Sequence, residues 1–162
     1  MSAMVSMVLL AATMTADDPV LACRAASGRP ALYILDGYGR PAAAALHEHP
    51  YAPDTFRPNV LERDSAGRWI IVGALTDLDS DRHGVPALVR FLPDGTPDPS
   101  YGARGLAQLP GTHRTWQLAL RASARISCQD RMLVGLETNR RPGFAVFRDD
   151  GTLATEVGSG GL

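Results

Sequence analysis

Two segments of the chain that lie 56 residues apart align without a gap. "RFLPDGTPDPSYGARGL" begins at Arg90 and "VFRDDGTLATEVGSGGL" begins at Val146, and both contain a phenylalanine, an Asp-Gly-Thr turn, two further glycines and a leucine at matching places. Another 56 residues upstream, a degenerate copy keeps Gly39 and a nearby proline. Tandem repeats of roughly this length are typical of arrays, solenoids and propellers, so one small structural unit is predicted to occur several times.

Each copy is predicted to contain four short antiparallel strands, as in a propeller blade. In the two better copies an apolar run bounded by turn residues is followed, after a loop, by a second apolar run. One further strand is expected before each pair and one after it. The strands expected in these copies are "FRPNVLER" (56–63), "RWIIVGAL" (68–75), "PALVRFL" (86–92), "GLAQLP" (105–110), "WQLALRA" (116–122), "RMLVGLE" (131–137) and "GFAVFRD" (143–149).

The predicted fold class is therefore all-β, with about three four-stranded antiparallel repeat units and a β-propeller-like arrangement. The whole chain, 1–162, is interpreted as a single repeat domain. Its degenerate first repeat covers 1–53, and the other two repeats cover 54–109 and 110–162.

The Asp-Gly turn explains why the chain reverses in each copy. Pro93 presets φ for the first turn position, Asp94 suits the next, and Gly95 can adopt the positive φ that a bulged hairpin requires. The last copy keeps an Asp-Gly pair at the same positions. The predicted structural turn residues are accordingly Gly39, Asp94, Gly95, Asp150 and Gly151.

The order of apolar strand, hairpin, strand, Pro-Asp-Gly-Thr and then Asp-x-Ser-aromatic-Gly resembles the delta-60 repeat, a bacterial repeat family. The best match is 93–96 followed by 98–102, with Tyr101 where the family usually has phenylalanine. The last copy departs from the pattern at several positions, among them Ala154. The resemblance covers 56–162 well and the first third by spacing alone. It implies propeller-like arrays and frequent export from the cytoplasm, and it supplies no catalytic residues.

Two N-terminal segments leave alternatives open. "RPAAAALHEHP" (40–50) is compatible with a strand or with a short helix. A helix after Gly37 and Gly39 would also suit a dinucleotide-binding turn, but Pro50 ends it early and no second unit follows. "MSAMVSMVLLAATMTA" (1–16) is interpreted as the opening strand of the first copy, the alternative being a secretory signal without its basic region.

Charge and cysteine content limit the classes of partner. The chain has 16 basic residues, all arginine, and 17 acidic residues, for a formal net charge of −1. With this balance, the chain has no excess of positive charge that would attract nucleic acid or an anionic membrane. No stretch is long enough to span a bilayer. Cys23 and Cys128 are interpreted as two buried thiols, the alternative being one bridge in an oxidising compartment.

Candidate metal ligands occur in one loop of the middle copy. Asp77, Asp79 and Asp81 alternate in "TDLDSDRHG" as the oxygen ligands of calcium loops do. Arg82 stands where such a loop has glycine, so a solvated acidic hairpin is favoured over calcium binding. No other cofactor is expected.

Histidines and tryptophans are interpreted as structural. His47 and His49 would lie on one face of a strand, but without a third ligand they are predicted to be exposed histidines and not a zinc site. Trp69 and Trp116 lie in or beside apolar strands and are predicted to be core anchors.

Two classes of function remain. The protein is interpreted as a non-catalytic repeat module for binding or assembly, whose partner is a protein, a glycan or a second copy of itself. The alternative is a propeller-type hydrolase or lyase assisted by a metal. The module is favoured because no nucleophile, base and orienting group converge in the motifs. Three copies are fewer than the four to eight blades of closed propellers, so a partial propeller or half of a dimeric ring is expected.

Overall fold

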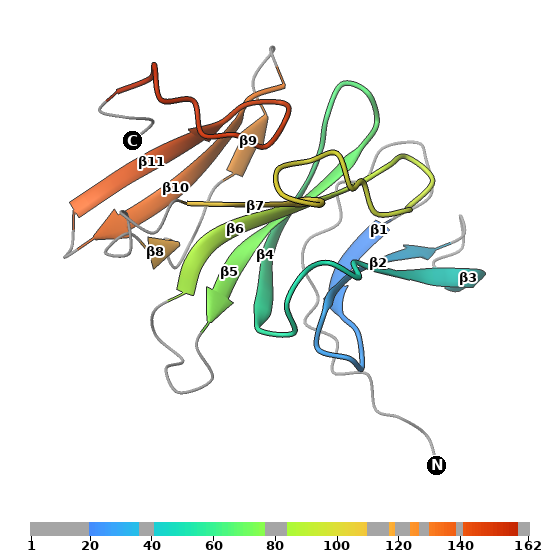
Figure 1. The fold of residues 1–162 in the computed structure, drawn as a ribbon. Coiled ribbons are helices and arrows are strands. Elements are labelled where there is room, and N and C mark those ends of the chain that lie inside the picture. Colours follow the sequence, from blue (N-terminus) through green and yellow to red (C-terminus); the bar gives the residue numbers. More distant parts are fainter. Residues whose placement is uncertain are drawn as a thin grey trace.

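The computed structural model describes residues 20–35, 41–76, 84–109, 117–118, 124–126, 130–138 and 141–158. These residues form three antiparallel β-sheets and no helix, so the predicted all-β class is confirmed. Figure 1 shows the sheets following one another across the molecule, from the N-terminal sheet in blue through the middle sheet in green to the C-terminal sheet in orange and red. No helix in the described part of the chain is long and apolar enough to cross a membrane.

The N-terminal sheet has the strand order β1-β2-β3. β1 (Val20–Arg24) and β2 (Pro30–Leu35) form an antiparallel hairpin, and β3 (Pro41–Glu48) pairs antiparallel with β2. The turn between β1 and β2 needs a glycine, because Gly28 has a φ of +83°. The Arg24 side chain braces this turn by donating from Nε to the Gly28 carbonyl over 3.0 Å.

The alternative of a short helix over 40–50 is wrong. Four consecutive alanines favour helix by local propensity, but the segment forms β3 and pairs with β2, with Leu32 opposite His47 and Ala31 opposite Glu48. Pairing with a neighbouring strand overrides the propensity of a short segment. The dinucleotide-binding alternative required a helix here, so it is also excluded.

The middle sheet has the strand order β4-β5-β6-β7, all antiparallel. Its strands are β4 (Phe56–Arg63), β5 (Trp69–Thr76), β6 (Gly84–Phe91) and β7 (Leu106–Gln108). The central strands β5 and β6 are apolar almost throughout because both faces of this sheet are buried. Gly73 is required where Phe56 packs over β5, since a Cβ there would lie 2.7 Å from the Phe56 ring.

The C-terminal sheet is centred on β10 (Met132–Thr138). β11 (Arg141–Phe147) pairs with one edge of β10, and the short strands β8 (Gln117–Leu118) and β9 (Ala124–Ile126) pair with the other. The strand expected over 116–122 is represented among the described residues by β8. Each of the three sheets falls within one of the three sequence ranges assigned to a repeat.

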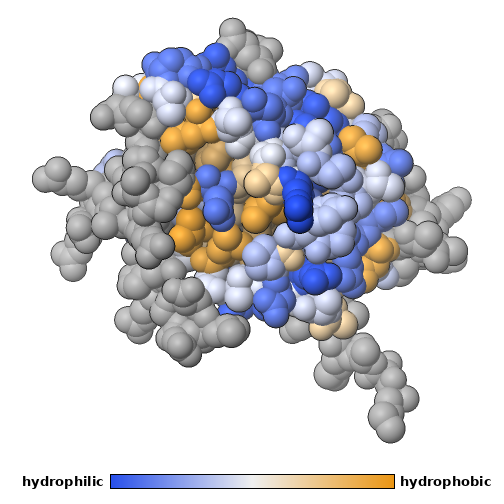
Figure 2. All heavy atoms as spheres, in the orientation of Figure 1, coloured by the Kyte–Doolittle hydropathy of each residue, from blue (hydrophilic) through white to orange (hydrophobic). Residues whose placement is uncertain are grey.

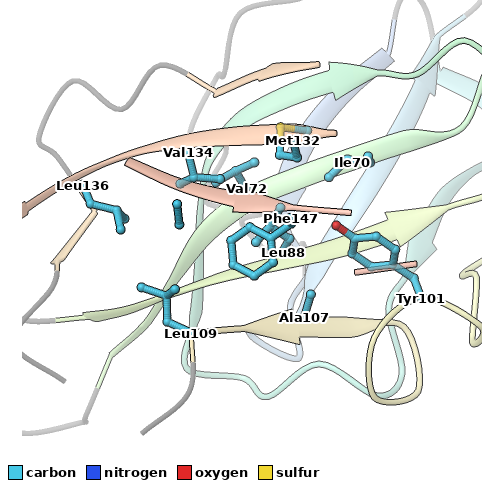
Figure 3. Close-up of a cluster of buried hydrophobic side chains, with 11 residues drawn as sticks. Ile70, Val72, Leu88, Tyr101, Ala107, Leu109, Met132, Val134, Leu136 and Phe147 are labelled. Carbon is cyan, nitrogen blue, oxygen red and sulfur yellow. The ribbon is translucent and has the colours of Figure 1, made fainter. Parts of the chain in front are cut away.

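Two hydrophobic cores hold the stack of sheets together. The first lies between the N-terminal and middle sheets and includes Leu32, Phe56, Trp69 and Phe91. The second, drawn in Figure 3, lies between the middle and C-terminal sheets. Its members are Ile70, Val72, Leu88, Tyr101, Ala107, Leu109, Met132, Val134, Leu136, Ala145 and Phe147. Because each buried large apolar side chain contributes roughly 1.5–3 kcal/mol, these cores dominate the stacking energy.

The turns after β6 and β11 have the same backbone hydrogen bonds. In the first, Leu92 N donates to Thr96 O over 2.7 Å and Gly95 N to Leu92 O over 2.9 Å. In the second, Arg148 N donates to Thr152 O over 2.8 Å and Gly151 N to Arg148 O over 2.9 Å. Both glycines have positive φ, +86° at Gly95 and +82° at Gly151. Two segments with the same Asp-Gly-Thr sequence therefore fold in the same way.

Candidate functional site

An ionic network crosses from the middle sheet to the C-terminal sheet, from a buried pair in the middle sheet to the exposed side chain of Asp149. Arg90 Nε donates to Asp98 Oδ2 over 2.8 Å, and the Arg90 and Asp98 side chains are both buried. The same guanidinium donates from Nη1 to the Asp149 main-chain oxygen over 2.5 Å and to Asp149 Oδ1 over 3.1 Å. Arg90 thus joins its own turn to the turn after β11, with charge-assisted hydrogen bonds on both sides.

The fold of the middle sheet positions both members of the Arg90–Asp98 pair. Arg90 lies near the end of β6, and the following turn returns the chain so that Asp98 N donates to the Arg90 carbonyl over 2.9 Å. Ser100 fixes the Asp98 carboxylate by donating from its backbone N over 3.0 Å and from its hydroxyl over 2.6 Å. The Arg90 guanidinium carbon lies 4.4 Å from the centre of the Tyr101 ring, which adds a cation–π contact.

Arg68 extends the network along the same side of the sheets. Its Nε donates to Asp64 Oδ2 over 2.5 Å, and its Nη2 pairs with Asp149 Oδ1. The neighbouring Ser65 donates to the Asp130 carboxylate from its backbone N over 3.1 Å and from its hydroxyl over 2.5 Å. The turn between β4 and β5 is therefore tied to the C-terminal sheet at two acidic residues.

The backbones of the two sheets also approach closely beside this network. Gly102 N donates to the Asp150 carbonyl over 2.7 Å. A Cβ on Gly151 would lie 2.7 Å from that same Gly102 nitrogen. Glycine at 151 is thus required by its positive φ and by the contact with the preceding sheet.

Two acidic residues of the network, Asp98 and Asp130, have a lowered pKa. Burial raises the pKa of Asp98, but hydrogen bonds from Ser100 and the charge of Arg90 outweigh burial, so this pKa lies below its usual value. Hydrogen bonds from Ser65 lower the pKa of Asp130 in the same way. Figure 2 shows polar side chains along the upper rim, where Figure 1 places the turn after β11, with apolar side chains gathered beneath them.

The residues predicted as turns and ligands are placed as follows. Asp94 Oδ1 accepts from Thr96 N over 2.9 Å, and Asp150 Oδ1 accepts from Thr152 N over 2.8 Å, so both aspartates stabilise their own turns. The loop between β5 and β6 is the one that carries the predicted calcium ligands. The loop residues and the degenerate turn glycine lie outside the described residues: Asp77, Asp79, Asp81 and Gly39.

The prediction that both paired histidines are exposed is wrong for His49. Its side chain is 0 % exposed, because the residue follows β3 into the space beside Phe91, with ring centroids 5.2 Å apart. Burial lowers the pKa of His49 to about 4, although the charge of Asp98 acts in the opposite direction. Neither ring nitrogen has a hydrogen-bond partner among the described residues. His47 is half-buried on β3.

The structure describes two of the four residues that were predicted to be core anchors or buried thiols. Trp69 is buried in the core between the first two sheets, and Cys23 is a free, buried thiol whose pKa is raised by burial and by the charge of Glu48. Trp116 and Cys128 lie outside the described residues.

The contacts of the network link the turns of the middle sheet to the C-terminal sheet. Its carboxylates accept hydrogen bonds from arginine or serine, and its arginines donate to carboxylates and carbonyls. No group of three metal-binding side chains occurs among the residues that the structure describes. Sequence reasoning missed this site, although a charged Arg90 inside the apolar run "PALVRFL" was a signal that a buried partner exists.

Comparisons with family models, with curated proteins and with solved structures give no match to this chain.

Proposed function

We propose that the protein is a non-catalytic, β-propeller-like repeat module that acts by binding or assembly. The observation that carries this proposal is the stack of three sheets, in which each sheet packs apolar side chains against the next. The middle sheet buries apolar side chains on both faces, and the ionic network seals one side of its contact with the C-terminal sheet. A chain organised in this way presents a rigid surface and not a reaction centre.

Equivalent positions in the three sheets support the repeat. Residues 34, 90 and 146 are spaced by 56, and Ile34 and Arg90 both face the sheet that follows their own: Ile34 packs against the core of the middle sheet, and Arg90 reaches the turn after β11. The residues that directly follow β3 and β7 also make corresponding backbone hydrogen bonds. His49 N donates to the Pro30 carbonyl over 2.9 Å, and Leu109 N donates to the Pro86 carbonyl over 3.2 Å.

The repeat itself is proposed to be a divergent member of the delta-60 type, on the residues 93–102. The motif residues of that segment have structural roles in this protein: Gly95 takes the positive φ, and the Asp98 carboxylate accepts hydrogen bonds from Ser100 and Arg90. These roles are all structural, which accords with a module that has no catalytic motif.

The proposal is tested by searching for turnover and bound metal in the purified full chain. We expect no hydrolysis of chromogenic ester, phosphoester and glycoside substrates, and no stoichiometric metal by elemental analysis. Turnover that scales with protein, disappears with a chelator and is lost in Asp79→Ala would establish the hydrolase alternative instead. An Asp54→Asn variant, altered at an exposed aspartate outside the β5–β6 loop, serves as the matched control.

A further inference from the structure

Two histidines at the end of β3 lie against glycine turns of the middle sheet. A Cβ on Gly95 would lie 2.8 Å from His47 Cδ2, and a Cβ on Gly105 would lie 2.7 Å from His49 Nε2. Both glycines have a positive φ, +86° and +84°. The contact between the N-terminal and middle sheets, called the first seam below, therefore contains two imidazole rings.

His49 is the imidazole that the closed first seam holds in its neutral form. Its side chain is 0 % exposed, and the Phe91 ring lies edge-on to it with centroids 5.2 Å apart. Neither ring nitrogen has a hydrogen-bond partner among the residues that the structure describes. Protonation would place a positive charge and a second N–H donor in this apolar contact, which costs free energy unless the ring reaches water.

The charged group that faces His49 from the middle sheet is Asp98. Its carboxylate accepts hydrogen bonds from Arg90 Nε and from the Ser100 backbone and hydroxyl. Burial lowers the pKa of His49 to about 4, although the charge of Asp98 acts in the opposite direction. From its own segment, His49 meets the Tyr51 ring, with centroids 6.1 Å apart. The negative charge of Asp98 is therefore too small an influence to stabilise a protonated His49 in the closed seam.

His47 differs from its neighbour because it can carry a proton where it lies. Its side chain is half-buried, and it faces the exposed Asp94. Hydrogen bonds from Thr96 lower the pKa of Asp94, and the charge of His47 acts in the same direction. A charged His47 is thus compatible with a closed first seam, and a charged His49 is not.

The contact between the middle and C-terminal sheets, called the second seam below, is built from other groups. Its turn glycine, Gly151, lies against Gly102 N and the Tyr101 ring, and Gly102 N donates to the Asp150 carbonyl over 2.7 Å. The hydrogen bonds that Asp130 accepts from Ser65 lower its pKa. These contacts are therefore retained in the pH range in which His49 takes up a proton.

We propose that His49 makes the first seam pH-sensitive, so that protonation of its imidazole in mild acid releases the N-terminal sheet from the middle sheet while the second seam stays closed. The released state exposes the apolar face of the middle sheet that carries Phe56, Trp69 and Phe91. This inference does not depend on the proposed binding function, because it concerns the contact between two sheets of one chain.

The test is hydrogen–deuterium exchange of the unsubstituted full chain at pH 7 and pH 4.5, corrected for the intrinsic exchange rates. With a pKa of about 4 in the closed seam and 6.5 in the open one, the opening equilibrium constant should rise on the order of 50-fold. Protection of the amides that pair β1 with β2 is expected to fall by this factor. Amides that pair β10 with β11 should keep their protection.

His49→Leu is expected to abolish the fall in protection, because leucine carries no proton and Leu109 ends the corresponding strand of the middle sheet. His47→Leu is the matched control and should retain the fall. Unchanged protection of β1–β2 in the unsubstituted chain, or an equal fall in β1–β2 and β10–β11, overturns the inference even if a variant fails to fold. A fall that persists in folded His49→Leu also overturns it. None of these outcomes bears on turnover or bound metal, so this inference and the proposed function fail separately.

Discussion

Arg90 and Asp98 form a buried ion pair around the turn after β6, with Arg90 Nε 2.8 Å from Asp98 Oδ2. Val146 and Ala154 occupy the positions 56 residues later, yet the backbone bond between them is retained. Ala154 N donates to Val146 O over 2.7 Å, as Asp98 N donates to Arg90 O over 2.9 Å. The same turn therefore accommodates either an ion pair or two apolar side chains.

Replacing Arg90 alone should destabilise the folded protein. Arg90→Val leaves Asp98 buried without its counter-charge, and the free energy of unfolding is expected to fall by about 3 kcal/mol. The double variant Arg90→Val with Asp98→Ala, which reproduces the residues of the C-terminal sheet, should recover much of that loss. Urea denaturation measures both values. Equal losses in the single and double variants would mean that the unpaired carboxylate is not the cause.

Gly151→Ala should lower the free energy of unfolding by more than the 1–2 kcal/mol typical of a positive φ, because its new Cβ would also lie 2.7 Å from Gly102 N.

Arg104→Gly is the reverse experiment. Arg104 is an exposed residue with a φ of +58°, so Arg104→Gly should leave stability unchanged or raise it by up to about 1 kcal/mol. Thermal and urea unfolding measure the stability of both variants. If Gly151→Ala and Arg104→Gly changed stability in the same direction, the explanation by positive φ would be contradicted.

Stability should fall in mild acid because of His49. Its pKa is about 4 in the folded protein against 6.5 as the ordinary value, so the unfolded chain binds the proton more tightly. The resulting stability is fully present above about pH 6.5 and is lost progressively toward pH 4, by about 3 kcal/mol in total. Urea unfolding near pH 7 and near pH 4.5 measures the difference.

His49→Leu is the control for this acid sensitivity, because Leu109 ends the corresponding strand of the middle sheet with an equivalent backbone bond. The variant should lose the pH dependence between about 6.5 and 4 while retaining the acid unfolding of the carboxylates at lower pH. An unchanged profile in His49→Leu would assign the effect to another group.

Tyr101→Phe is expected to preserve or increase stability. The Tyr101 hydroxyl is buried and has no hydrogen-bond partner among the described residues, and burial raises its pKa. Removing the hydroxyl abolishes its desolvation cost, a gain of about 1 kcal/mol, and leaves the ring beneath Arg90. A clear loss of stability in thermal unfolding would reveal a partner for this hydroxyl.

Calcium is expected to leave the melting temperature unchanged, since a solvated acidic loop is favoured for Asp77, Asp79 and Asp81. Differential scanning calorimetry with calcium and with a chelator measures this directly. A calcium-dependent rise in melting temperature that is lost in Asp79→Ala would instead establish the aspartate loop as a binding site.

Much of the fold could be predicted from local patterns. The strand expected over 56–63 is β4 with the same bounds, and the apolar runs of the middle copy form β5 and β6. The turn at Gly95 was predictable because a Pro-Asp-Gly sequence restricts φ within a few residues. Local patterns left 40–50 undecided between a strand and a short helix, and pairing with β2 decided for the strand β3.

The conformational preferences that form turns and strands act over a few residues. The sequence alone was therefore enough to predict the short strands of the three sheets and the turns between them. The network needed the tertiary structure, because Arg90 and Asp149 are 59 residues apart in the chain and meet only when the sheets stack. The same holds for His49, whose burial depends on Phe91 in the neighbouring sheet. Which side chains are covered, and which stay partly exposed as Leu133 and Phe144 do, follows from packing between sheets and from no local pattern.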